Sequence, residues 1–140
     1  MNIQEIIKRR SYGRTRIHYS NELIYDLDDL LKLNGLLPNK DDLLPIEFQK
    51  VKKIVSTLLN KGLAYPEEYM PIHEANEYSE YLLQGFKEME CQCFCNGAWD
   101  EYHKPSNGFG WNHMTNSTFD AGVIITSNDL HFCFWVEEED

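Results

Sequence analysis

The segment HFCFWVEEED at residues 131–140 decides the fold, because it joins an apolar strand pattern to the densest run of acids in the chain. Alternate residues from Phe132 to Val136 face one side of an extended chain, and Cys133 and Trp135 face the other. Both faces are apolar, which predicts a central strand covered by helices on one side and by a loop or a partner on the other. We expect the acids to begin where this strand leaves the core.

Three further segments alternate with the period of a strand. ECQCFCNGAW at 90–99 and TFDAGVIITS at 118–127 are rich in strand-forming residues, and SYGRTRIHY at 11–19 fits an edge strand or an extended arm. Ser127, Asn128 and Asp129 favour a tight turn, so the last two strands, 118–127 and 130–138, should form a hairpin.

The chain before residue 90 has mostly helical periodicity. Helices are expected over about 2–10, from a cap at Ser20 to Gly35, from about Pro45 to Lys61, and from about His73 to Met89. In the second of these, the leucines that recur on the inner face are Leu23, Leu27, Leu30 and Leu31.

This order of elements predicts an α+β fold, with N-terminal helices packed on a C-terminal antiparallel sheet. A length of 140 residues with 42% hydrophobic side chains is enough for a core, so residues 1–140 should form a single domain. The N-terminus MNIQEIIKRR has no apolar signal region, and no apolar run approaches the ~20 residues that span a bilayer. We expect a cytoplasmic protein without membrane contact.

Charge is segregated along the chain. Residues 1–61 hold 11 Lys and Arg against 8 Asp and Glu, a net of +3, whereas residues 62–140 hold 2 against 15, a net of −13, which together give −10. Like charges without counterions create a field that attracts cations. The sequence thus predicts a negative surface that binds a basic protein partner. Phosphate contacts need Lys and Arg, so direct nucleic-acid binding is not expected.

The N-terminal cations are the exception to this acidic balance. Lys8, Arg9, Arg10, Arg14 and Arg16 lie close together in the sequence. We expect this basic patch to pair with the chain's own acids, and contact with nucleic acid is the alternative.

The candidate partner-binding residues combine the C-terminal acids with aromatic residues of a long loop, residues 100–117. Loops of this length in compact domains are often functional, and Tyr and Trp dominate binding hot spots. The alternative is that the aromatic side chains fold back and seal the sheet. The predicted set is Glu74, Glu77, Glu80, Asp100, Glu101, Tyr102, Trp111, Glu137, Glu138, Glu139 and Asp140.

Sequence motifs assign no catalytic residue, cofactor or metal. HEANE at 73–77 has Glu77 where the zinc motif His-Glu-x-x-His needs its second histidine. NGFGW at 107–111 lacks the lysine of a phosphate-binding loop. The residues left without an assigned chemical role are His103, His113 and His131.

The four cysteines are expected to be reduced and structural. Cys91, Cys93 and Cys95 alternate on one strand, so their successive Cα atoms should lie about 6.6 Å apart. Sulfurs that share one tetrahedral zinc lie within ~4.6 Å of each other, so a straight strand presents these thiols poorly for a metal.

The small size, the acidic balance and the ending FDAGVII…FCFWVEEED together resemble the immunity proteins of bacterial polymorphic and contact-dependent inhibition toxins. The resemblance implies a cognate toxin, commonly a basic nuclease domain, whose active site or substrate-binding surface the acidic protein blocks. Phage anti-defence proteins that mimic DNA are an alternative, because their acids imitate phosphates. A small ligand-binding domain or enzyme that uses the aromatic and histidine loop at 100–114 is another.

Overall fold

The computed structural model describes residues 1–24, 26–65, 67–97 and 112–139, with the backbone alone at Met89. The predicted α+β class is confirmed. In chain order the elements are α1 (Ile3–Arg9), β1 (Arg14–Ser20), α2 (Leu27–Leu33), the 3₁₀ helix η1 (Lys40–Asp42), β2 (Leu44–Ile46), α3 (Phe48–Asn60), α4 (Ile72–Leu83), the 3₁₀ helix η2 (Glu88–Glu90), β3 (Cys91–Cys95), β4 (Phe119–Ser127) and β5 (His131–Glu138).

The five strands of the described ranges form one antiparallel sheet in the order β1-β5-β4-β3-β2. β5 is central in the sense that it is an interior strand paired on both sides, since Phe134 is opposite Ile17 of β1 on one side and Val123 of β4 on the other. The central strand, the β4–β5 hairpin and the edge position of β1 are therefore confirmed. β2 is a difference from the sequence-based expectation. Pro45, expected in the first turn of a helix, lies on this edge strand, where a residue without an N–H is tolerated.

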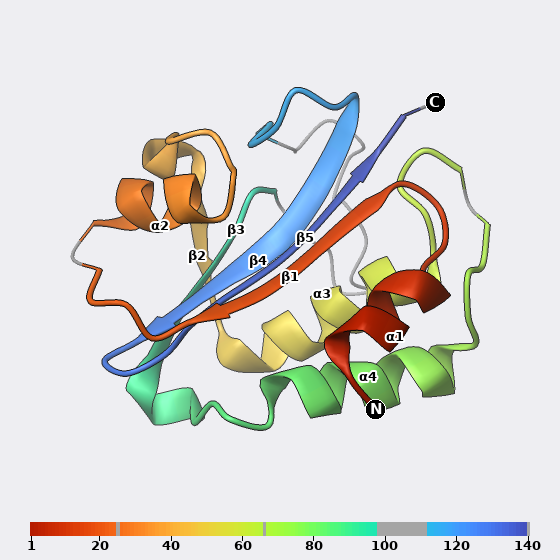
Figure 1. Cartoon of the computed structure of the whole chain (residues 1–140), viewed down its shortest axis with the longest axis horizontal. Coiled ribbons are helices and arrows are strands. Elements are labelled where there is room, and N and C mark those ends of the chain that lie inside the picture. The colour runs from red at the N-terminus through yellow and green to blue at the C-terminus, as the bar shows by residue number, and fades with distance from the viewer. Residues whose placement is uncertain (25, 66, 98–111, 140) are drawn as a thin grey trace.

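The sheet has an apolar core on each face (Figure 1). Helices α1, α3 and α4 cover the face that carries Phe132, Phe134 and Val136. The other face carries Cys133 and Trp135, and α2 covers it together with loop residues. Period-two alternation with two apolar faces thus produces a strand that is buried on both sides, as the sequence predicts.

The helices begin and end close to the predicted positions, with two exceptions. α2 begins only after Asp26, whose carboxylate accepts a hydrogen bond from the backbone N–H of Asp28, whereas the Ser20 hydroxyl makes a local bond to the N–H of Glu22. Leu23 therefore lies outside the helix and is 74% exposed, although its spacing predicted an inward position. α4 ends at Leu83, well before Met89.

Within the described ranges, no helix has both the length and the apolar character that a membrane crossing needs.

Shortening a buried side chain of β5 should destabilise the protein strongly. Phe134 is fully buried, and Phe→Ala changes in a core typically cost about 3–5 kcal/mol in unfolding free energy. We expect Phe134→Ala to lower that free energy by this amount in urea titration, while Leu23→Ala at its exposed position leaves it nearly unchanged. Equal transition midpoints for the two variants would contradict the placement of β5.

Candidate functional site

A buried ion pair between Arg10 and Glu138 joins the two ends of the chain. Neither side chain is exposed to solvent. The Arg10 guanidinium donates to Glu138 Oε2, to the carbonyl of Leu58 at 2.6 Å and to the carbonyl of Tyr12 at 2.9 Å. A buried charge is tolerated when it is paired and hydrogen-bonded, and each of the three guanidinium nitrogens of Arg10 donates a hydrogen bond.

The other carboxylate oxygen of Glu138 is also occupied. Oε1 accepts from the backbone N–H of Leu63 at 2.9 Å and of Ala64 at 3.1 Å, and it lies 3.4 Å from the Tyr69 hydroxyl. Burial, followed by the charge of Glu138, raises the pKa of Tyr69 to about 12, so its hydroxyl keeps the proton that it donates. Glu138 is therefore an internal residue with its hydrogen-bonding capacity in use.

Glu137, the neighbour of Glu138, also forms an ion pair within the chain. Its Oε2 lies 3.0 Å from Arg16 Nη2, and its Oε1 accepts from the Ser117 hydroxyl at 3.0 Å. The expectation that the acids begin where the strand leaves the core is corrected, because β5 continues through Glu137 and Glu138 and both are buried. Glu139 follows the strand and is exposed.

Three of the five cations of the basic patch pair with the chain's own acids, whereas Lys8 and Arg14 form no ion pair with a described residue. Besides the pairs of Arg10 and Arg16, Arg9 Nε lies 2.7 Å from Glu74 Oε2. Each of these pairs joins an N-terminal arginine to an acid of residues 62–140. The segregation of charge along the sequence is thus partly cancelled in space.

The predicted partner-binding residues divide into three groups. Glu74, Glu137 and Glu138 are in the internal ion pairs described above. Glu77, Glu80 and Glu139 are exposed and form no ion pair with any described residue. The predicted residues that lie outside the described ranges are Asp100, Glu101, Tyr102, Trp111 and Asp140.

Asp120 is the centre of a second buried polar cluster, on the α2 face of the sheet. Its Oδ1 accepts from Trp135 Nε1, Asn96 Nδ2 and the backbone N–H of Met114, each at 3.1 Å. The indole reaches it because Gly122 has no side chain, since a Cβ there would lie 2.5 Å from the Trp135 ring. These bonds place residues 112–118 on the sheet.

His113 approaches this carboxylate from solvent. Its Nδ1 lies 3.3 Å from Asp120 Oδ2, and its side chain is 52% exposed. An aspartate that holds one imidazole nitrogen is also found in catalytic triads, where the other nitrogen activates a nucleophile. Here the Thr115 hydroxyl donates to Asp120 and the Ser117 hydroxyl donates to Glu137. The described contacts therefore support a structural role for this cluster in ordering the loop.

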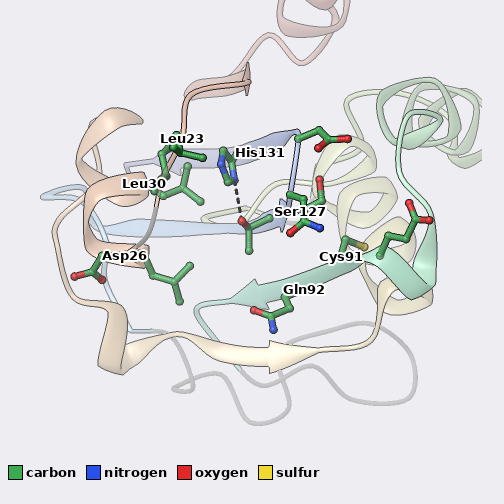
Figure 2. Close-up of a pocket in the computed structure, with 13 residues that line it drawn as sticks. Leu23, Asp26, Leu30, Cys91, Gln92, Ser127 and His131 are labelled. Carbon is green, nitrogen blue, oxygen red and sulfur yellow. Dashed lines mark hydrogen bonds between the residues drawn. The ribbon is translucent and has the colours of Figure 1, made fainter.

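A cleft of about 910 Å³, named the α2 cleft, opens on the same face of the sheet (Figure 2). Leu23, Asp26 and Leu30 come from α2 and the segment before it, and Cys91 and Gln92 of β3 lie across from them. None of these residues was predicted from the sequence as a binding residue. The complete lining is Leu23, Ile24, Asp26, Leu27, Leu30, Glu90, Cys91, Gln92, Thr126, Ser127, Asn128, Asp129 and His131.

His131 supports the cleft by tying two of its walls together. Its Nε2 faces the carbonyl of Glu22 at 3.1 Å, and its Nδ1 lies 2.8 Å from the Thr126 hydroxyl. A carbonyl oxygen only accepts hydrogen bonds, so Nε2 is the donor to Glu22. Nδ1 then forms the hydrogen bond with the Thr126 hydroxyl. Both ring nitrogens are used, which makes His131 a structural tie between β5 and the segment before α2.

The sulfurs of Cys91 and Cys93 lie closer together than the Cα spacing of about 6.6 Å expected for these residues on a strand. Cys91 Sγ is 3.9 Å from Cys93 Sγ, within the ~4.6 Å that a shared zinc allows, because the two side chains converge. All four cysteines are free thiols. Among the described residues, no group of three or more His, Cys, Asp or Glu side chains is arranged to hold a metal ion.

Comparison of the chain with protein-family models, with curated proteins and with solved structures finds no match.

Removing the charge of Glu138 should destabilise the fold. Glu138→Gln leaves the buried Arg10 guanidinium without its counterion, and breaking a buried ion pair in this way typically costs about 3–5 kcal/mol. Glu139→Gln changes the same charge on the exposed neighbour and should alter the unfolding free energy little. Urea titration of both variants measures the difference, and a Glu138→Gln protein as stable as Glu139→Gln would contradict the pair's structural role.

The thiols should differ in their reactivity towards a disulfide reagent. Burial raises the pKa of every cysteine thiol, and that of Cys133 to about 12, so the thiols stay protonated at pH 8 and react slowly. We expect partly exposed Cys91 to react first in the native protein and all four to react in denaturant. Fewer than four reactive thiols in denaturant would indicate a disulfide, and early labelling of Cys133 would contradict its burial.

Proposed function

We propose that the protein binds and neutralises a basic protein partner, most simply as an immunity protein against a cognate bacterial toxin. The observation that supports this proposal is a set of exposed acids of residues 62–139 that form no ion pair with a described residue. Its members are Glu67, Glu68, Glu77, Glu80, Glu88, Glu90, Asp129 and Glu139.

These acids are the charges that remain after the internal ion pairs have formed. Glu74, Glu137 and Glu138 already have arginine partners, so they contribute little field to the surroundings. Glu77 and Glu80 lie on the exposed side of α4, one turn apart. Such uncompensated like charges cost folding free energy, and a cationic partner would relieve that repulsion on binding.

The first experiment identifies the partner. The tagged protein is purified from its native host, and the reading frame next to its gene is expressed with and without it. A basic partner whose toxicity is relieved by co-expression supports the proposal, and an acidic partner or an unrelieved toxicity contradicts it. Toxicity of the partner when it is expressed alone identifies a toxin inhibitor, whereas a DNA-binding partner that is not toxic identifies a DNA mimic that blocks a defence protein.

Neutralising exposed acids should slow association with the partner. Opposite charges can raise association rates well above the uncharged range of ~10⁵–10⁶ M⁻¹s⁻¹, and salt removes this gain. We expect the double variant Glu77→Gln/Glu80→Gln to associate more slowly and with a flatter salt dependence, whereas Trp111→Ala should mainly speed dissociation. Stopped-flow kinetics at two salt concentrations test both. A rate that ignores salt in the unmodified protein would contradict the electrostatic proposal.

A further inference from the structure

One wall of the α2 cleft is apolar and open to solvent. Leu23 is 74% exposed, and Ile24 and Leu27 beside it are only partly buried. Leu30, which is 1% exposed, forms the inner end of this wall. A large apolar side chain at the rim of a cleft is more informative than a single exposed leucine elsewhere, because it can be buried by a ligand that enters the cleft.

The opposite wall is acidic and lacks counterions. Cys91, which lies across the cleft from Leu23, is opposite Ser127 in the sheet, so the preceding Glu90 and the turn residue Asp129 lie on the same side of the cleft. Both acids are exposed without an ion pair among the described residues. Asp26, on the apolar side, is held by Lys40, whose Nζ lies 3.0 Å away. No Lys or Arg is among the described residues that line the cleft. The uncompensated negative charge therefore faces the apolar wall across the opening.

The cleft is held open by bonds that do not involve a ligand. The imidazole of His131 fixes the carbonyl of Glu22, immediately before Leu23, to β5. The Ser127 hydroxyl accepts from the backbone N–H of Leu130, which closes the turn that carries Asp129. Both walls are thus tied to the sheet, so the cleft is already formed before a ligand binds. Binding then spends less free energy on ordering the protein.

We propose that the α2 cleft receives a short basic segment of the protein partner, with an apolar side chain on Leu23 and an Arg or Lys side chain between Glu90 and Asp129. This inference rests on the proposed function, because it assigns to the basic partner a place on the surface. Charge complementarity selects a cation, and the adjacent apolar wall selects a neighbouring aliphatic or aromatic residue. The α4 acids Glu77 and Glu80 would then steer the partner without entering this contact.

A peptide probe tests the cleft itself. The probe is a labelled peptide of alternating Leu and Arg, compared with equally long peptides of alternating Ser and Arg and of alternating Leu and Glu. We expect the Leu-Arg peptide to bind most tightly and Glu90→Lys/Asp129→Lys to weaken it about tenfold or more, since like charges then face it. Leu23→Ser should weaken the same peptide severalfold.

The matched control is Glu77→Lys/Glu80→Lys, which makes the same change of charge on α4. It should leave peptide binding nearly unchanged, and thermal melting checks that every variant is folded. Equal binding of the Ser-Arg and Leu-Arg peptides, or equal losses in the cleft and α4 variants, would overturn the proposal.

Binding of the whole partner separates this inference from the proposed function. Loss of partner binding in Glu90→Lys/Asp129→Lys, with only slower association in Glu77→Lys/Glu80→Lys, supports both. Partner binding that withstands the cleft variant but depends on salt and on α4 overturns the cleft inference alone. An acidic or salt-insensitive partner overturns the proposed function, whatever the peptide does.

Discussion

The buried pair of Arg10 and Glu138 is the interaction on which the rest of the structure depends. Arg10 follows α1, contacts the carbonyl of Leu58 near the end of α3, and meets Glu138 at the end of the central strand. Two desolvated charges are tolerated where good geometry and additional hydrogen bonds compensate for the lost water. The contacts of Arg10 join the end of α1, the end of α3 and the end of β5, so they hold the helical layer against the sheet. The N–H groups of residues 63 and 64 bring the following loop to the same point.

This constraint also determines which charges are left for a partner. Three arginines of the first 61 residues each pair with an acid from the remainder of the chain. Charges that are separated along the sequence therefore neutralise each other in the folded protein. Among the described residues from 62 on, the exposed acids without an ion pair lie on α4, on the loop before it, at η2, at the β4–β5 turn and at Glu139. In Figure 1, α4 leads into the segment that carries η2, and the β4–β5 turn lies at the same end of the molecule. The acids of η2 and of the β4–β5 turn, Glu90 and Asp129, are thereby brought to the α2 cleft from separate segments.

The elements with strong periodicity could be predicted, and those determined by tertiary contacts could not. The two apolar faces of β5 identified a central strand, and Gly35 marked the end of α2 correctly with a φ of +73°. The start of α2 was missed, because capping by Asp26 prevailed over the leucine spacing that placed Leu23 inside. The burial of Glu138 was missed because a terminal run of acids is usually solvated, and its partner lies 128 residues away. The α2 cleft had no local signal, since its walls come from distant segments.

The second face of the sheet explains why a binding cleft can exist beside such a compact core. Helices α1, α3 and α4 pack on the first face, whereas the second face has α2, a helix of 7 residues, and among the described residues the α2 cleft lies between α2 and residues of β3 and β4. On this face, hydrogen bonds of polar side chains hold the loops in place. Asp120 holds the loop at Met114, and His131 holds the segment that carries Leu23. Hydrogen bonds hold these segments in place without filling the space between them, as apolar packing would. A surface of fixed shape, apolar on one side and acidic on the other, is the result, and it is suited to a ligand that combines both properties.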